Sequence, residues 1–337
     1  MPVLLGLVIF VLLLILTGVL YQYAGATADA RRYPSPGVMI DIGTGSLNAV
    51  ILGAGSPVVV FEAGIASTTL SWQLVQPEIG TFSQTVSYDR AWLGWSDPLP
   101  EPRHIWTQVE ELRRMLARAA LGSPRVLVAH SYGGLIAQAY ALRYPQELAG
   151  MVLVDPAAAA QWTKPSKTLR LGVSLSRRGA FLARIGLVRF ALNRLTSGSR
   201  TLPKLIARAS SGQGGGLIER LVGQVQKLPR EVWPLIQSRW CDPKCFEGMA
   251  RYLEALPENA ASVPASPLGD LPLIVLSSET ASAIERQEHE ELARRSTRGR
   301  LEIVSGSGHW IQLDRPDVVI QAIRELFTFM HVHTRPS

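Results

Sequence analysis

Ser131 is the residue of this chain whose surroundings best suit a nucleophile. It lies in VAHSYGG (128–134), where an apolar run meets a serine and two glycines, and this pattern predicts a strand, a tight turn and a helix. Ala129 stands two residues before the serine, where glycine is usual, and adds one methyl group that such a turn can tolerate. Because a serine hydroxyl is a poor nucleophile until a base takes its proton, the prediction requires a base nearby.

A histidine and two carboxylates follow other apolar runs of the chain. His309 follows LEIVSGSG, Asp155 follows MVLV, and Glu279 follows LPLIVLSS. Because the carboxyl ends of parallel strands share one edge of a sheet, we expect these side chains near Ser131. There His309 would take the Ser131 proton, and a carboxylate would hold the imidazole tautomer and stabilise its charged form.

Two backbone N–H groups are candidates for an oxyanion hole, which stabilises the negative oxygen formed when a serine attacks a carbonyl carbon. One belongs to Tyr132, at the start of the helix that follows Ser131. The other belongs to Ile65, directly after the small pair Ala63-Gly64 that ends an apolar run.

Apolar strands alternate with helical stretches along most of the chain, which predicts an α/β fold. Since the apolar runs look buried on both sides, the sheet should be mostly parallel and covered by helices on both faces. Residues 37–156 and 271–333 are expected to form this core. Residues 157–270 lack convincing strands, which predicts a helical cap inserted after the sixth strand. After an opening hairpin within 38–52, strands are expected at 57–64, 85–90, 125–130, 150–156, 271–278 and 301–308.

The first 22 residues predict a transmembrane anchor. Residues 2–20 carry no charged side chain, and 18 of them are long enough to cross a bilayer as a helix. A cleaved signal peptide is the alternative, although it would open with a basic residue and have a shorter apolar part. Residues 23–36 would form a linker. The expected location is therefore the membrane, with a single-pass N-terminal anchor. Its side stays open, because Arg31 and Arg32 favour a cytoplasmic body while the signal-like ending favours the opposite.

The positive charge of the chain is local. The net charge is +7, yet residues 157–270 alone hold 17 Lys or Arg against 7 Asp or Glu. No recognition motif, repeat or aromatic-interleaved basic strip accompanies this charge, so a nucleic-acid partner is not expected. An anionic membrane surface and an ordinary solvated helical surface both fit the basic segment.

The cysteines Cys241 and Cys245 are the only two in the chain. Two thiols cannot complete a zinc site, and no histidine lies near them in sequence. A disulfide and two free thiols both stay open as interpretations, the first only outside the cytoplasm.

Four stretches together resemble the α/β-hydrolase superfamily, in particular its cap-bearing bacterial esterase-like and lipase-like members. The resemblance covers about residues 36–335 and is weakest in the cap. The order and spacing of the four make it specific, and they imply an α/β-hydrolase fold with a Ser–His–acid triad. The stretches are VVVFEAG, similar to the oxyanion strand; YDRAWLGWSDP, similar to the loop Y-D-x-R-G-x-G-x-S; VAHSYGG, similar to the nucleophile elbow; and SGSGHWIQLDRP, similar to the loop of the catalytic histidine.

The chain departs from the family pattern in three ways. Ala63 stands where a histidine is common, and Trp92 stands where glycine is usual. In many relatives the acid follows the strand after the cap, where Glu279 is close but about two residues early. Asp155 instead resembles the acid position of the pancreatic-lipase group, so we favour Asp155. Its alternative role is that of a turn or cap residue before Pro156.

These observations predict a serine hydrolase that cleaves carboxylic esters, lipophilic ones in particular, through Ser131, His309 and Asp155. A serine nucleophile disfavours the dehalogenase and epoxide-hydrolase chemistries of the same fold, which use aspartate. Amide or thioester hydrolysis by the same triad, and a non-catalytic membrane-tethered interaction protein, stay open as alternatives. No metal or organic cofactor is required. The physiological substrate, its acyl chain length and the oligomeric state are not determined by the sequence.

Overall fold

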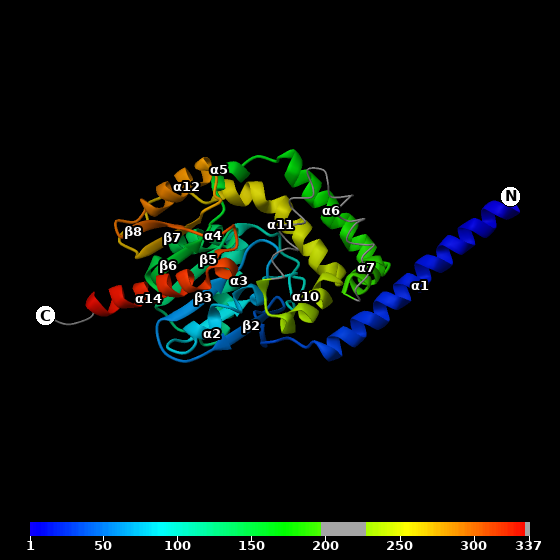
Figure 1. Cartoon of the computed structure of the whole chain (residues 1–337), viewed down its shortest axis with the longest axis horizontal. Coiled ribbons are helices and arrows are strands. Elements are labelled where there is room, and N and C mark those ends of the chain that lie inside the picture. The colour runs from blue at the N-terminus through cyan, green and yellow to red at the C-terminus, as the bar shows by residue number, and fades with distance from the viewer. Residues whose placement is uncertain (197–226, 334–337) are drawn as a thin grey trace. The chain divides into compact units, whose positions relative to one another are not determined.

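The computed structural model describes residues 1–196 and 227–333 (Figure 1). The chain divides into two compact units. One contains Pro36–Ser166 and the chain from Arg251 onward, and the other contains Met1–Ser35 and Lys167–Ala250. The first unit holds the sheet and every predicted site residue.

The sheet of the first unit has eight strands in the order β1-β2-β4-β3-β5-β6-β7-β8. The opening hairpin is antiparallel and pairs with β4, and the strands from β4 to β8 run parallel to one another. This arrangement confirms the predicted mostly parallel sheet. The strands are β1 (Val38–Asp41), β2 (Ser46–Leu52), β3 (Val58–Glu62), β4 (Thr85–Tyr88), β5 (Arg125–His130), β6 (Leu148–Val154), β7 (Leu273–Ser278) and β8 (Gly299–Val304).

The central strands are buried on both faces because helices cover the sheet on each side. Every residue of β3, β5 and β7 is buried, as expected for apolar runs in a parallel sheet. On one face, the region of η1 (Thr69–Trp72) and α2 (Gln76–Ile79) packs with α14 (Pro316–His333) around a shared apolar core. On the other face α4 (Gly133–Arg143) packs against β3, β5 and β6 and against α3 (Ile105–Arg118). Helix α12 (Ala283–Ala293) packs against β7 and β8.

In the described part of the insertion between β6 and β7 the regular elements are helices, joined by non-helical segments, and residues 197–226 of the predicted cap lie outside the described ranges. The division into units groups residues 167–250 with the N-terminal helix and leaves both ends of the insertion with the sheet. The boundaries 157–270 of a cap domain therefore stay a prediction. The described helices are α5 (Ala159–Trp162), α6 (Lys167–Arg184), α7 (Leu187–Thr196), η4 (Arg230–Val232), α10 (Trp233–Trp240) and α11 (Pro243–Ser262).

Helix α1 (Pro2–Arg32) is the one helix in the described ranges that is long and apolar enough to cross a membrane, a test that a signal sequence also passes. The helix is longer than predicted. The chain stays helical to Arg32 instead of leaving the helix at residue 22, so residues 23–32 of the predicted linker belong to α1. The reason lies in the second unit, where Gln22 Nε2 donates to the carbonyl oxygen of Cys241 at 2.8 Å. Arg189 also forms a 2.6 Å ion pair with Asp29.

The two cysteines are free thiols in the structure. Cys241 is buried, and burial raises the pKa of its thiol to about 11. It therefore stays protonated at neutral pH, which disfavours reaction of this sulfur as a thiolate.

Candidate active site

Ser131 lies at the apex of the turn between β5 and α4, as the sequence predicts. Its φ of 52° is in the left-handed region, which is strained for a residue with a side chain. Hydrogen bonds hold this conformation: its N–H donates to Val154, and its carbonyl oxygen accepts from the N–H groups of Gly134 and Ala157 at 2.9 and 3.0 Å. The strained turn lifts the hydroxyl above the end of the sheet.

Gly133 explains why a small residue must follow two positions after Ser131. A Cβ atom at Gly133 would lie 2.7 Å from the carbonyl oxygens of both Glu62 and Ala63. The start of α4 therefore packs directly on the end of β3, and even a methyl group would force the two elements apart.

His309 lies between Ser131 and Asp155 and contacts both. Its Nε2 is 2.9 Å from Ser131 Oγ, and its Nδ1 is 2.7 Å from Asp155 Oδ2. Because a carboxylate only accepts hydrogen bonds, Nδ1 carries the proton in the neutral ring, and Nε2 accepts from the serine hydroxyl. The three groups thus form a continuous hydrogen-bonded chain across the ends of β5, β6 and the loop after β8.

Asp155 is held for this contact by backbone groups. Its Oδ1 accepts from the N–H of Ser278 at 2.8 Å, and its own N–H donates to Leu276 at 2.7 Å. Burial alone would raise the pKa of Asp155, but the hydrogen bond and charge of His309, with the Ser278 N–H, bring it below its usual value. The carboxylate is therefore ionised at neutral pH.

Glu279, the other candidate acid, does not contact His309. Its Oε2 accepts from the N–H of Gly306 at 2.7 Å. This hydrogen bond holds the loop that leads from β8 to His309, whereas Asp155 contacts the imidazole.

His130 packs against His309 and forms a hydrogen bond with its backbone. Its ring is fully buried, and its Nε2 donates to the carbonyl oxygen of His309 at 2.8 Å. The two rings lie 4.8 Å apart between centroids. Burial, together with the neighbouring His309, lowers the pKa of His130 to about 3, so it packs as a neutral ring.

The two predicted oxyanion donors, the N–H groups of Ile65 and Tyr132, donate to no acceptor in the described part of the chain. The side chain of Tyr132 turns away into the protein, where its Oη accepts from Gln108 Nε2 at 2.6 Å and Asn259 Nδ2 at 2.8 Å. Tyr132 can therefore offer a substrate its backbone donor.

Trp92 replaces a glycine of the family motif at a position that needs one. Its φ is 72°, a left-handed conformation that glycine adopts without cost. Contacts offset the strain: Trp92 Nε1 donates to Leu99 at 2.8 Å, and the guanidinium of Arg251 lies 4.3 Å from the ring.

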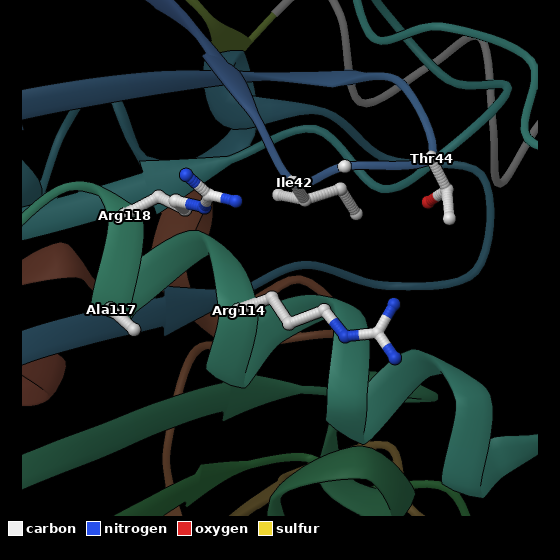
Figure 2. Close-up of a pocket in the computed structure, with 6 residues that line it drawn as sticks. Ile42, Thr44, Arg114, Ala117 and Arg118 are labelled. Atoms are coloured by element: carbon white, nitrogen blue, oxygen red, sulfur yellow. The ribbon is translucent and has the colours of Figure 1, made fainter.

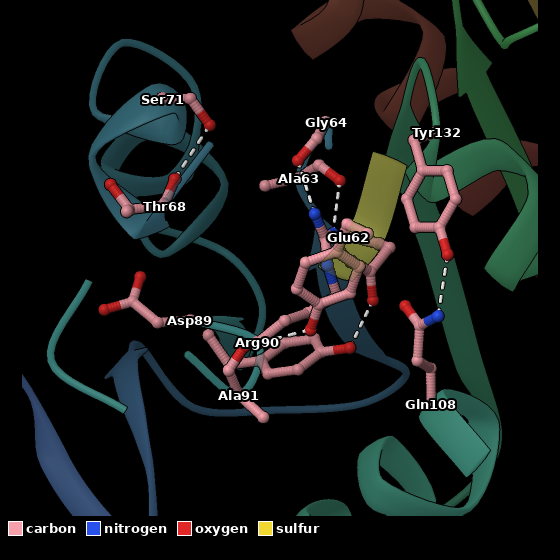
Figure 3. A network of polar contacts seen from close by, with 12 residues as sticks. Glu62, Ala63, Gly64, Thr68, Ser71, Asp89, Arg90, Ala91, Gln108 and Tyr132 are labelled. Carbon is pink, nitrogen blue, oxygen red and sulfur yellow. Dashed lines mark hydrogen bonds and ion pairs between the residues drawn. The ribbon is translucent and has the colours of Figure 1, made fainter. Parts of the chain in front are cut away.

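Sequence reasoning missed a buried polar network beside the site, which Figure 3 shows. Glu62 at the end of β3 and Arg90 after β4 form an ion pair, and Tyr88 donates its hydroxyl to the same carboxylate. A carboxylate inside the apolar run VVVFE was the available signal, because a buried charge requires a partner.

A hollow of about 480 Å³ lies apart from these groups, between the loop after β1 and helix α3 (Figure 2). Arg114 and Arg118 project beside it from α3, together with Ile42 and Thr44 of the loop. None of the predicted site residues lines it. In the described ranges no group of three or more His, Cys, Asp or Glu side chains is arranged to hold a metal ion.

A model of the alpha/beta hydrolase family matches residues 59–322, and the chain therefore belongs to this family. The thermophilic esterase from Thermogutta terrifontis aligns with a TM-score of 0.60 at 22% identity, over 87% of this chain and 98% of its own. MGS-M2, an alpha/beta hydrolase enzyme from a Medee basin deep-sea metagenome library, aligns with a TM-score of 0.58 at 17% identity, over 86% and 97%. These two likenesses show the fold.

Among curated proteins, the uncharacterized protein YqjL of Bacillus subtilis is 34% identical over 105 residues, which are 31% of this chain and 42% of YqjL. The chain spans less than half the length of the curated relatives that it matches.

Proposed function

We propose that this protein is a serine hydrolase that cleaves carboxylic esters. The observation that supports it most is the hydrogen-bonded chain from Asp155 through His309 to Ser131. A base in contact with a serine hydroxyl, itself oriented by an ionised carboxylate, is the arrangement that activates serine for acyl transfer.

The reaction follows from this geometry. As Ser131 Oγ bonds to the acyl carbon, its proton passes to His309 Nε2, and the carbonyl electrons move to the oxygen. The N–H groups of Ile65 and Tyr132 bind that oxyanion, and each is worth about 3 kcal/mol. Collapse of the intermediate breaks the ester C–O bond, and His309 returns the proton to the leaving alcohol. A water molecule then gives a proton to His309 as its oxygen bonds to the acyl carbon. The bond from this carbon to Ser131 Oγ breaks, His309 returns the proton to Oγ, and the acid leaves.

Asp155 is the proposed acid, in preference to Glu279. Its carboxylate contacts Nδ1 and opposes the positive charge that His309 gains when it takes the serine proton. The hydrogen bond of Glu279 to Gly306 supports a role in holding the histidine loop instead.

We further propose that α1 anchors the enzyme in a membrane and that the substrate is lipophilic. Residues 3–14 of α1 are apolar, and nearly every side chain among them is exposed. Such a surface is unfavourable in water and favourable in hydrocarbon. The basic composition of residues 157–270 also suits an anionic bilayer.

Labelling of the full-length protein with a fluorophosphonate tests the proposal. We expect labelling of the wild type and none of Ser131→Ala, because only an activated serine reacts. A folded wild type that is not labelled would overturn the hydrolase proposal and favour a non-catalytic interaction protein. Matched p-nitrophenyl ester, anilide and thioester substrates then measure the preference for esters over amides and thioesters.

A further inference from the structure

Arg90 holds two consecutive carbonyl groups of the loop that carries Ile65. Its Nη1 donates to the carbonyl oxygen of Ala63 at 2.6 Å, and its Nη2 donates to that of Gly64. The same Nη1 donates to the carboxylate of Glu62, and both charged side chains are almost fully buried, at 3% and 2% exposed. Figure 3 shows the fork of the guanidinium pointing at these carbonyls. The planar fork of arginine suits this double contact.

Aromatic rings keep the guanidinium in place. The ring centroids of Tyr132 and Tyr252 lie 5.3 and 5.2 Å from the guanidinium carbon of Arg90. Tyr252 also donates its hydroxyl to the carbonyl oxygen of Ala91 at 3.0 Å, directly beside Arg90 in sequence. Burial alone would lower the pKa of Arg90, but the negative charge of Glu62 raises it above its usual value. The group is therefore both charged and immobile.

The peptide between Gly64 and Ile65 transmits this contact. It is trans, so its C=O and N–H lie in one plane and point in opposite directions. The carbonyl oxygen of Gly64 accepts from Arg90 and also from the N–H of Ser67 at 3.1 Å, so the N–H of Ile65 must face away from Arg90. The Gly64 backbone lies against the residue next to Ser131, because a Cβ at Gly64 would be 3.0 Å from His130 Nδ1.

We propose that Arg90 is a positioning residue of the oxyanion hole, which holds the carbonyl of Gly64 so that the N–H of Ile65 is aimed at the oxyanion. The inference rests on the proposed hydrolase function and adds a residue that never contacts substrate. A donor fixed in advance needs no reorganisation when the negative charge develops. Loss of Arg90 should therefore lower kcat and leave KM nearly unchanged.

The test compares two double variants of the full-length protein in the hydrolysis of a p-nitrophenyl ester. Glu62→Gln/Arg90→Gln removes both buried charges together, so that neither is left unpaired. Arg125→Gln/Glu147→Gln is the matched control, because this second ion pair is also largely buried, at 8% and 15% exposed, and Arg125 begins β5 at the end opposite to Ser131. The side-chain hydrogen bonds of Arg125 go to Leu121, Tyr140 and Glu147. We expect a fall in kcat of about 100-fold for the first variant, and little change for the control.

Two further measurements separate positioning from general damage. A trifluoromethyl ketone forms the oxyanion on Ser131, so its affinity should fall in parallel with kcat/KM, while that of the product acid should not. Arg90→Lys keeps the charge beside Glu62 but lacks the fork, and we expect a partial loss of kcat.

Wild-type kcat in the folded Glu62→Gln/Arg90→Gln variant, or equal losses in both double variants, would overturn the inference. If the double variant does not fold, wild-type kcat in Arg90→Lys overturns it. A wild type that fluorophosphonate does not label would instead remove the proposed function, and this inference with it.

Discussion

Asp155 Oδ2 lies 2.7 Å from His309 Nδ1, although 154 residues separate the two in the chain. Asp155 follows β6 and Glu279 follows β7, and these strands are neighbours in the sheet. Both carboxylates thus lie near the loop that carries His309, but only Asp155 points at the imidazole. Glu279 contacts Gly306 in the same loop. The two acids therefore hold the histidine in different ways, one through its ring and one through its loop.

Asp155→Asn should lower kcat for a p-nitrophenyl ester by about 10⁴-fold with little effect on folding, because an amide no longer fixes the required tautomer of His309. Glu279→Gln is the control, since its amide oxygen can still accept from Gly306. A larger loss of kcat in Glu279→Gln than in Asp155→Asn would contradict the assignment of the acid.

Gly133→Ala should destabilise the protein by about 1–3 kcal/mol, because the new methyl group meets two carbonyl oxygens at the end of β3. It should also lower kcat, since it displaces the loop before Ile65. Gly122→Ala is the matched control, because nothing lies within 4 Å of a Cβ there. Urea unfolding and ester hydrolysis measure both effects, and equal stability of the two variants would count against the close packing.

His130 should make stability depend on pH between about 3 and 6.5. The unfolded chain binds a proton at His130 below about pH 6.5, whereas the folded protein binds it only near pH 3. The stabilisation is therefore complete above pH 6.5. It is lost at up to about 1.4 kcal/mol per pH unit as the pH falls. The lowered pKa of Asp155 acts only below about pH 4, where it overlaps with the lower end of the His130 window.

Urea unfolding of wild type and His130→Gln from pH 4 to 7 measures this dependence. The variant should show a smaller slope with pH over that range, whatever its absolute stability. His104→Gln serves as control, because the ring of His104 is 45% exposed. An unchanged slope in His130→Gln would show that the buried ring is not responsible.

Deletion of residues 2–14 should release the protein from vesicles in an alkaline carbonate wash. The deletion removes exposed apolar residues but keeps Gln22 and Asp29, which contact Cys241 and Arg189 within the second unit. Activity on long-chain esters in vesicles should fall about tenfold or more, because the enzyme loses its local concentration at the bilayer. Activity on a soluble short-chain ester should stay the same. Unchanged long-chain activity in vesicles would contradict delivery from the membrane.

Much of the fold could be predicted because its signals are local. The apolar runs that became β3, β5 and β7 are buried on both faces, and such strands show their burial in composition alone. The turn at Ser131 was predictable for the same reason, since a small residue is needed where α4 meets β3. The end of α1 could not be predicted in this way, because the part of the helix beyond residue 22 contains Asp29, which forms an ion pair with Arg189, 160 residues away.

The sequence by itself determined that Ser131, His309 and two carboxylates would come to one edge of a parallel sheet, since strand order along the chain places them at strand ends. Only the tertiary structure decided which carboxylate meets the histidine, because Asp155 and Glu279 follow adjacent strands and differ in the direction of their side chains. It also decided that Arg90 lies against the carbonyl groups of Ala63 and Gly64. A buried charge needs partners, but which residues these are depends on the tertiary structure and cannot be read from composition or from spacing along the chain.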